Sequence, residues 1–400
     1  MNAPGALRLG YLVPEFPAQT HVFFWREAQA LRDSGVELRF VSTRRPPPEA
    51  CRHAFAAEAR AATRYLYPPR LWAALLWLLL HPLRAGRALG YVFGLRETPR
   101  ARRLRVLGML LCAADLAATQ RALPLDHLHV HSCADAAHVA ALFHRLTGVP
   151  YSLSLHGDLG VYGRDHASKM RDAAFVAVVT QDLQRQVLAQ VGLPEARVPV
   201  IRMGVDTSRF VAPPERPASD GLHVVTVARL AECKGHRYAL EALRALADDG
   251  FDLRYTIAVD GPDLAAIEAD IARLRLGQRA SLVGSLGEGD VLRLVQSADA
   301  FVLPSVGYGE AAPVAVMEAM ACGTPVVCSI IGGTPELIRD GEDGFLVRQA
   351  DVAGLGAALR RLALDRGLRA RLAHAARERA LRDFDHRRWA HTLLERIRPA

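Results

Sequence analysis

The segment from Leu303 to Val347 constrains the fold of this chain more than any other. It contains the end of an apolar strand, a glycine-rich loop, a short helix, a second strand over 325–330 and a Gly-Gly turn into another helix. This alternation is typical of an open α/β fold with a parallel sheet. Such folds bind ligands at the carboxyl ends of their strands.

Two carboxylates, Glu310 and Glu318, lie eight residues apart in this segment. Pro313 suits the first turn of the helix, which places Glu310 in the preceding loop and Glu318 about one and a half turns inside. Both can point into one cleft. The helix start offers the backbone of Ala311, Ala312, Pro313 and Val314, whose N–H groups (Pro313 has none) favour an anion. The set suits a ligand with phosphate between two pairs of hydroxyls, such as a nucleotide-sugar. The alternative is that the two glutamates are ordinary surface charges whose spacing arises by chance.

The same segment resembles the signature of the retaining family 4 glycosyltransferases, which have the GT-B fold. The family pattern has two Glu separated by seven residues, an Ala-Met-Ala-x-Gly-x-Pro-Val-Val run and a Gly-Gly-x-Pro-Glu turn. The matching residues are Glu310, Glu318, 319–321, Gly323, 325–327, Gly332, Gly333, Pro335 and Glu336. Ala311 replaces a Gly of the family, and its methyl group could tighten the loop.

The size and charge of the chain limit its organisation and its partners. Its 400 residues fit two domains. A net charge of +8 favours anionic partners such as nucleotides, lipid phosphates or a membrane surface. No nucleic-acid module is present, so nucleic acid is not expected. Six cysteines without a CxxC pair, and a start without a signal peptide, indicate a cytoplasmic protein with reduced thiols.

The first half begins with a strand (7–13), a loop (14–21), a helix (22–34) and a strand (36–42), a doubly wound pattern. The loop lacks GxGxxG, so a dinucleotide site, as in a Rossmann dehydrogenase, is not supported. This stretch resembles the opening of exopolysaccharide-type members of the family, in which the loop lies at the cleft. Thr20 and His21 are therefore cleft candidates.

Histidines recur further along this half. His127, His129 and His131 alternate on an expected strand, so they share one face. Their spacing makes a zinc site conceivable, but no further ligand is arranged beside them, and we expect no metal. The strand 151–155 ends at His156, which matches the strand-end His-Gly of the family. The resemblance implies that His156 contacts the donor sugar near the reacting carbon.

Residues 67–122 combine two apolar runs (71–80 and 106–118) with an Arg-rich run (96–105). Neither apolar run is long enough to span a bilayer. One interpretation is two or three helices packed on the first domain. The other is a basic and apolar surface that rests on the inner membrane leaflet.

The second half starts after a Pro-rich linker over 211–221, preceded by an expected strand and turn at 198–210 that resembles a Gly-Val-Asp hinge. Arg229 and Lys234 follow the strand 222–228 and precede a helix, which suits a diphosphate clamp. The chain has 48 Arg and two Lys, and one Lys lies in this motif. An ammonium is not interchangeable with a guanidinium at a tight phosphate site. The alternative is a pair of solvated cations.

Two further turns resemble ligand-binding turns of the family. The first contains Gly261, with Val259 in place of a family Gly. In the second, the family holds the nucleobase mainly with backbone groups. Its residues here are Gly284, Ser285 and Leu286.

We therefore expect an α/β GT-B protein with two Rossmann-like domains facing across a cleft. The expected parts are an acceptor-binding domain (1–210), a linker (211–221), a nucleotide-sugar domain (222–380) and a final helix (381–400) that crosses back. The resemblance implies retaining transfer from a UDP- or GDP-sugar to a glycan or polyprenyl-linked hydroxyl in cell-surface polysaccharide synthesis, without a metal or cofactor.

The resemblance also implies the roles of the charged residues. Arg229 and Lys234 would neutralise the diphosphate, Glu310 would hold the sugar and Glu318 the ribose. The alternatives are a nucleotide-sugar epimerase of the same fold and a catalytically silent nucleotide-binding subunit.

Overall fold

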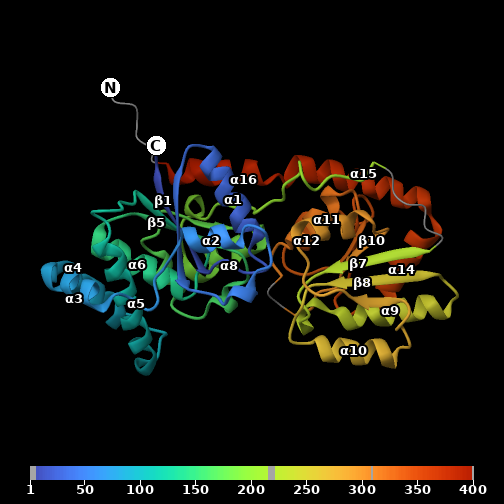
Figure 1. Ribbon diagram of the computed structural model, residues 1–400, viewed down its shortest axis with the longest axis horizontal. Coiled ribbons are helices and arrows are strands. Elements are labelled where there is room, and N and C mark those ends of the chain that lie inside the picture. The colour runs from blue at the N-terminus through green and yellow to red at the C-terminus, as the bar shows by residue number, and fades with distance from the viewer. Residues whose placement is uncertain (1–5, 215–220, 308–309, 399–400) are drawn as a thin grey trace. The chain divides into compact units, whose positions relative to one another are not determined.

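A computed structural model describes residues 6–214, 221–307 and 310–398. Its contacts divide the chain into two compact units. One comprises Met1–Arg202 with Arg388–Ala400, and the other comprises Met203–Arg387. Each unit contains one six-stranded sheet with helices around it (Figure 1). Most of the expected linker, 215–220, and residues 308–309 of the glycine-rich loop lie outside the described residues.

The sheet of the first unit has the strand order β3-β2-β1-β4-β5-β6, with each neighbouring pair parallel. Its strands are β1 (Arg8–Glu15), β2 (Glu37–Arg44), β3 (Thr63–Tyr65), β4 (His127–Val130), β5 (Tyr151–Leu155) and β6 (Val176–Val178). The helices are α1 (Val22–Asp33), α2 (Ala56–Ala62), α3 (Leu71–Leu80), α4 (Pro82–Phe93), α5 (Arg100–Ala118), α6 (Asp135–Thr147), α7 (His166–Met170), α8 (Gln181–Val191) and α16 (His386–Ile397). Short 3-10 turns are η1 (Pro48–Ala50), η2 (Leu159–Tyr162) and η3 (Glu195–Arg197).

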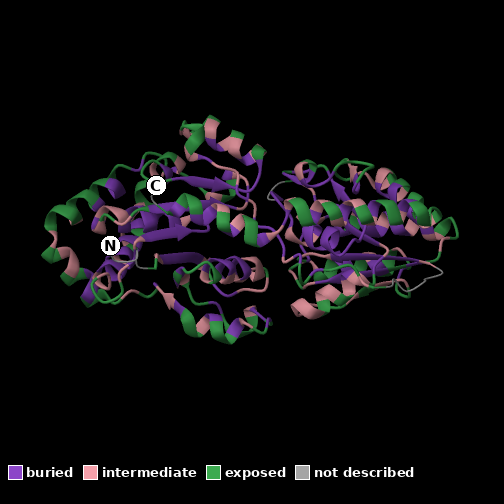
Figure 2. Ribbon diagram, turned by 90° about the horizontal axis from the view of Figure 1, so that it is seen from above, coloured by how far each residue is buried: buried purple, intermediate pink, exposed green. Residues whose placement is uncertain are grey.

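The core of the first unit forms because its central strands are covered on both faces. Every residue of β4 and β5 is buried, as expected for a parallel sheet between helix layers (Figure 2). The final helix contributes to this core as well. Ala390, Leu393, Leu394 and Ile397 of α16 are buried in one cluster with strand and α1 residues. The last helix is thus part of the first unit's core.

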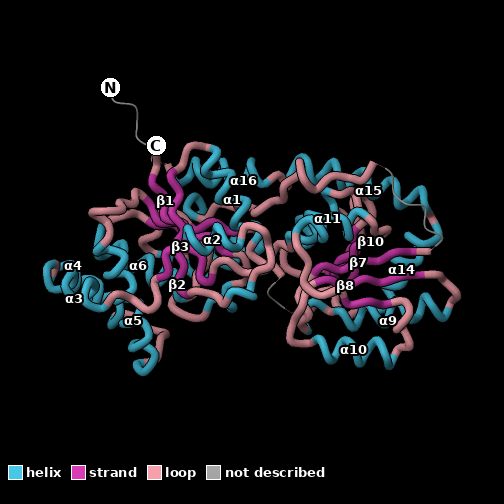
Figure 3. The backbone as a smooth tube through the Cα atoms, in the orientation of Figure 1, coloured by secondary structure: helices cyan, strands magenta, loops and turns pink. Residues whose placement is uncertain are grey.

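The sheet of the second unit has the strand order β12-β11-β10-β7-β8-β9, again with parallel pairs (Figure 3). Its strands are β7 (Leu222–Val227), β8 (Leu253–Ala258), β9 (Ala280–Leu282), β10 (Ala300–Leu303), β11 (Val326–Ser329) and β12 (Phe345–Val347). Its helical elements are η4 (Glu232–Lys234), α9 (His236–Asp248), α10 (Leu264–Arg273), α11 (Glu288–Gln296), α12 (Val314–Ala321), α13 (Thr334–Leu337), α14 (Val352–Leu364) and α15 (Arg366–Asp383).

Consecutive residues of β7 show how this sheet is sandwiched. Val224 belongs to a buried cluster with residues of α9, α10 and α14. Val225, its neighbour, belongs to a second cluster with residues of α12 and α15. Because side chains alternate across a strand, the two clusters lie on opposite faces. The unit is therefore doubly wound, with helices on both faces, as the alternation of strands and helices predicts.

Residues 198–210 differ from the expected strand. In the structure, Val200 and Val205 each form only an isolated bridge, to Val178 and to Asp385. The left-handed Gly204 explains part of this difference, because a side chain there would collide with the backbone of Phe384 and His386. The segment is pinned locally and does not extend a sheet.

Residues 67–122 form the three helices α3, α4 and α5 in the first unit. In this unit α3 packs against α5, and α4 packs against α6. Among the described residues, no helix is both long enough and apolar enough to cross a membrane.

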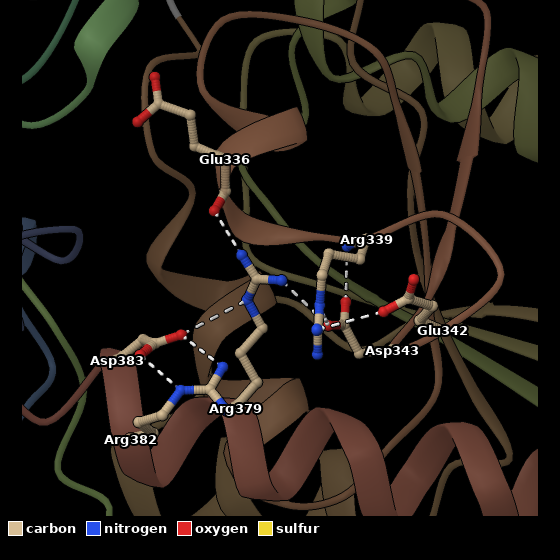
Figure 4. Close-up of polar contacts among 7 residues, drawn as sticks. All are labelled: Glu336, Arg339, Glu342, Asp343, Arg379, Arg382 and Asp383. Atoms are coloured by element: carbon tan, nitrogen blue, oxygen red, sulfur yellow. Dashed lines mark hydrogen bonds and ion pairs between the residues drawn. The ribbon is translucent and has the colours of Figure 1, made fainter.

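One buried carboxylate fixes the long helix α15 to the turn between α13 and β12 (Figure 4). Asp343 is fully buried, and it accepts hydrogen bonds from the backbone N and Nε of Arg339 and from Nη1 of Arg379. Arg379 also donates to the carbonyl of Glu336 at 2.8 Å. A buried charge is tolerated only with such partners, so this set ties two distant parts of the unit together.

Replacing Asp343 with Ala should lower the free energy of unfolding by about 3 kcal/mol, because Arg379 would lose its buried partner. Urea unfolding of the full chain, followed by circular dichroism, measures this change. The control is Glu342→Ala. Glu342 pairs with the same Arg339 but lies 64% exposed, so its loss should cost no more than about 0.5 kcal/mol. Equal losses for the two variants would contradict this account.

Candidate functional site

The strand order of the second sheet reverses between β10 and β7, which are neighbours in space but far apart in sequence. Open α/β sheets bind ligands outside the carboxyl ends of their strands at such a reversal. The loops after β7 and after β10 both leave the sheet there. The first loop carries Arg229 and Lys234, and the second carries Glu310.

Lys234 and Glu310 meet across this reversal. The Nζ atom of Lys234 forms an ion pair with Oε2 of Glu310, and the same oxygen accepts a hydrogen bond from Oγ of Ser305 at 2.8 Å. The Glu310 side chain is only 9% exposed, and that of Lys234 is 23% exposed. A carboxylate removed from water in this way depends on its cation. Ser305 received no role from the sequence, although it lies inside the signature segment.

Arg229 lies in the same loop but is exposed. Its carbonyl accepts a hydrogen bond from Nε2 of His236, at the start of α9, which fixes the backbone of the loop. Within the part of the chain that the structure describes, no ion pair is recorded for its guanidinium. The reversal therefore presents one cation held by a carboxylate and a second one available to a ligand.

Two glycines allow these loops to touch backbone to backbone. A Cβ at Gly235 would lie 1.9 Å from the carbonyl oxygen of Pro304, and one at Gly332 would lie 1.9 Å from that of Glu310. Both glycines have positive φ, a backbone conformation that residues with a side chain rarely adopt. The amide of Gly333 also donates to the carbonyl of Ala311 at 2.7 Å. The Gly-Gly turn thus supports the loop that carries Glu310.

The turns after β8 and β9 are joined to one another. The amide of Ser285 donates to the Asp260 carboxylate at 3.1 Å, and the amide of Val259 donates to the carbonyl of Gly284 at 2.8 Å. Gly261 lies against the backbone of Leu230, where a Cβ would be 2.1 Å from the carbonyl oxygen. The turn that contains Gly261 therefore lies against the loop that carries Arg229. The turn that contains Gly284 lies in turn against the one that contains Gly261.

Val259 stands in a conformation that suits glycine. Its φ is +90°, in the region that a β-branched residue rarely adopts. The family resemblance places a Gly at this position, so the substitution noted in the sequence has a physical consequence. The turn carries local backbone strain.

The helix α12 holds the second predicted glutamate. Glu318 lies in its middle and is buried, among neighbours that are buried as well. Pro313 is the residue just before the first turn, so it precedes the helix instead of occupying that turn. Ala311 and Ala312 are buried and Val314 is partly buried. Leu286, from the turn after β9, is also partly buried.

The strand order of the first sheet reverses between β1 and β4. His131 directly follows β4, and His156 directly follows the neighbouring strand β5. Their rings approach each other, with Nδ1 of His131 3.1 Å from Nε2 of His156. The backbone amide of His156 donates to the Tyr162 hydroxyl at 2.7 Å. The predicted His156 is therefore fixed through both its ring and its backbone.

A buried carboxylate completes this arrangement. Oε1 of Glu27, on α1, lies 3.3 Å from Nε2 of His131 and accepts a hydrogen bond from the Tyr11 hydroxyl at 2.7 Å. Burial lowers the pKa of His131 and of His156 to about 3, so both rings are neutral near pH 7. Glu27 was not among the predicted site residues. Its spacing from Phe24, Ala28 and Leu31 on the apolar face of a helix was the available signal.

The alternating histidines have other partners than a metal. His127 and His129 both contact Oγ of Ser152, and His129 also contacts Oγ of Ser154. Both side chains thus lie on one face of the sheet, as the alternation predicts. The serine hydroxyls that they contact come from the neighbouring strand β5. In the described ranges, no group of three or more His, Cys, Asp or Glu is arranged to hold a metal ion.

The loop after β1 carries the two remaining candidates. Thr20 is exposed. His21 is partly buried beside the Phe24 ring, and removal from water lowers its pKa to about 4. Among the residues that the structure describes, no contact distinguishes Thr20 as a site residue.

Replacing Gly332 with Ala should strongly lower the apparent melting temperature, because the new methyl group would displace the backbone of Glu310. We expect the free energy of unfolding to fall by more than about 2 kcal/mol. The control is Gly341→Ala. Gly341 also has positive φ, but its Cβ would meet nothing within 4 Å. The free energy of unfolding of this control variant should fall by about 1 kcal/mol, from backbone strain alone. Thermal denaturation of the two full-length variants measures the difference. Equal shifts in melting temperature would show that close packing against Glu310 does not add to the cost of the substitution.

Comparison with known families covers nearly the whole chain. The Glycosyltransferase Family 4 model matches residues 20–209, and the Glycosyl transferases group 1 model matches residues 211–379. A protein of Escherichia coli named as a colanic acid biosynthesis glycosyltransferase is 33% identical over 252 residues, which cover 62% of this chain and 61% of that protein. The chain thus matches less than two thirds of that relative. A glycogen synthase of Mycobacterium tuberculosis is 30% identical over 67% of each chain.

Solved structures share the fold at low sequence identity. HepE of Anabaena, in complex with UDP-glucose, has a TM-score of 0.73 and 18% identity, with 97% of this chain and 100% of that chain covered. A glycosyltransferase of Rickettsia africae has a TM-score of 0.72 and 17% identity, with 98% of both chains covered. With its two parallel six-stranded sheets and both family matches, this chain belongs to the family 4 glycosyltransferases of the GT-B fold.

Proposed function

We propose that the protein is a retaining glycosyltransferase that moves a sugar from a UDP- or GDP-sugar to a hydroxyl of a glycan or lipid-linked acceptor. The observation that carries this proposal is the ion pair between Lys234 and the buried Glu310 at the strand reversal, beside the exposed Arg229. Family membership supports it. Relatives named for the biosynthesis of colanic acid and of amylovoran favour a role in cell-surface polysaccharide synthesis.

The two cations would act on the diphosphate of the donor. Charge develops on this group as it leaves, and fixed cations in a partly dry site stabilise that charge. The Lys234 ammonium is held in place by Glu310, while Arg229 is exposed beside the start of α9. A diphosphate between them would meet two positive charges and a helix N-terminus. HepE binds UDP-glucose with the same fold, which favours a nucleoside-diphosphate sugar.

The carboxylates would hold the two hydroxyl-bearing parts of the donor. Glu310 would accept from sugar hydroxyls through the oxygen that Lys234 and Ser305 leave open, since both bind Oε2. Glu318 would accept from the ribose hydroxyls, and the turn at Gly284, Ser285 and Leu286 would hold the base. His156 would contact the sugar near the reacting carbon.

This arrangement favours a reaction without a covalent sugar–enzyme intermediate. A nucleophilic carboxylate needs a partner acid about 5 Å away, and here Glu310 is engaged by Lys234 and Ser305. The bond between the anomeric carbon and the diphosphate oxygen would break as the acceptor oxygen bonds to the same face. The departing phosphate would take the acceptor's proton.

A screen of common UDP- and GDP-sugars tests the function. We expect thermal stabilisation by the correct donor and nucleotide release that rises with an acceptor. Conversion of the donor to another sugar without an acceptor would indicate an epimerase. Binding without nucleotide release under any condition would indicate a silent subunit. We also infer that no metal takes part, so EDTA should leave release unchanged.

Replacing Lys234 with Ala should lower kcat for nucleotide release about 10²-fold or more, because the diphosphate loses a positioned cation and Glu310 loses its partner. Lys234→Arg should not fully restore it, since a guanidinium differs in shape from an ammonium. The control is Arg237→Ala, which removes an exposed cation from the first turn of α9. Unchanged turnover in Lys234→Ala would refute the diphosphate role.

Replacing His131 with Leu should lower kcat about tenfold or more with little change in the donor KM. The nearby Glu27 favours a proton on Nε2 of His131, which leaves Nδ1 as the acceptor for Nε2–H of His156. His131→Asn keeps a polar atom near the position of Nδ1, so it should retain most of the activity. Loss of activity to the same extent in both variants would contradict a role in orienting His156.

A further inference from the structure

The helix α3 presents its bulky apolar side chains outward. Its inward face consists of the buried Ala73 and Ala74 and the partly buried Trp77 and Leu78. The other six residues are all Leu or Trp and all exposed: Leu71, Trp72, Leu75, Leu76, Leu79 and Leu80. A helix of a globular protein normally shows the reverse pattern, with its polar face toward water.

The neighbouring helices extend this surface. Leu83, Leu89 and Phe93 of α4 are exposed, and Leu83 is 84% exposed. Leu104 on α5 is 73% exposed. In the first unit, α3 and α4 lie side by side at the margin, beyond α5 and α6 (Figure 1). A monomer rarely exposes a continuous apolar patch of this kind, and such patches usually mark an interaction site. We call this surface the α3–α4 patch.

The segment that contains the α3–α4 patch is strongly basic. Between Glu58 and Asp115 the chain has ten arginines and one acidic residue, Glu97. Arg87 on α4 and Arg100 and Arg102 on α5 are exposed. The described side chains include no ion-pair partner for these three arginines. An apolar face with unpaired cations on the same and the neighbouring helix, α4 and α5, matches a surface with an apolar interior and anionic headgroups.

We propose that the α3–α4 patch docks on an anionic lipid bilayer, with α3 lying in the interface. α3 has ten residues, so its length of about 15 Å lies well below a membrane span. Its exposed Leu and Trp side chains would enter the boundary between headgroups and acyl chains, and the arginines would meet lipid phosphates. Trp72 has the amphipathic ring that is enriched at this depth.

A second copy of the chain suits the patch less well. A symmetric dimer places the same patch against itself. The arginines around one patch would then face those of the other, with one glutamate per copy to offset them. An anionic bilayer meets both the apolar and the basic part of this surface.

The docking proposal rests on the proposed function only for its biological role, which would be to bring the enzyme to a lipid-linked acceptor in the bilayer. Its test needs no turnover. The full chain is sedimented with vesicles of phosphatidylcholine alone or mixed with phosphatidylglycerol at about two to one. We expect binding to the anionic vesicles, a blue shift of tryptophan fluorescence on binding, and loss of that shift in Trp72→Phe.

Two sets of variants separate the apolar and basic parts. The triple variant Leu75→Ser, Leu79→Ser and Leu83→Ser should weaken binding more than about tenfold to any vesicle. Its control is Leu123→Ser with Leu364→Ser, which changes exposed leucines elsewhere. Arg87→Glu with Arg100→Glu should weaken binding more than about tenfold to anionic vesicles. Its control, Arg52→Glu with Arg171→Glu, has the same net charge.

Several outcomes would overturn the proposal. If the triple leucine variant sediments like the wild type, the α3–α4 patch is not the docking surface. If the wild type ignores both kinds of vesicle and light scattering shows a dimer that the triple variant loses, the occupant is a second copy. Nucleotide release with a water-soluble acceptor should stay unchanged in the triple variant. A protein that binds vesicles but turns over no donor would refute the proposed function and leave the docking proposal intact.

Discussion

The Lys234–Glu310 ion pair is the contact on which the candidate site depends. A carboxylate that is mostly removed from water is stable only beside a cation and hydrogen-bond donors. Glu310 has both, from Lys234 and Ser305. The pair forms because two strands distant in sequence, β7 and β10, lie next to each other where the order of the sheet reverses. The parallel sheet therefore creates the site, and the ion pair joins its two loops.

Close backbone contacts hold these loops at the required distance. Gly235 lies against Pro304, Gly261 against Leu230 and Gly332 against Glu310, at distances that exclude a side chain. This explains why these three glycines matter physically. They leave no room between the loops, so Lys234 and Glu310 have a fixed separation. The strained Val259 is the exception, where the chain keeps a turn that suits glycine without having one.

Much of this was predictable from the sequence. Strand and helix alternation predicts the doubly wound sheets, and strand 151–155 and the start of α9 fall where expected. The family resemblance assigned Lys234 and Glu310 to the same donor site, with Lys234 in the loop after strand 222–228 and Glu310 in the loop before the helix that contains Glu318. The sequence did not reveal Glu27 behind His131, since that contact joins α1 to the residue after β4 across about 100 residues of chain. Two further contacts were not predicted from the sequence. One is the pairing of Asp343 with Arg379, and the other is the hydrogen bond from Ser305 to Glu310, because the folded structure decides which side chain each group contacts.

The central claim is that Lys234 and Glu310 act together on one donor. A double-mutant cycle tests it, with calorimetric affinities of the accepted nucleotide-sugar for the wild type, Lys234→Ala, Glu310→Gln and the double variant. Because the two side chains share one ion pair and one ligand, their effects should not add, and we expect a coupling energy of about 1 kcal/mol or more. Losses that add to within about 0.5 kcal/mol would show two independent residues and contradict the account.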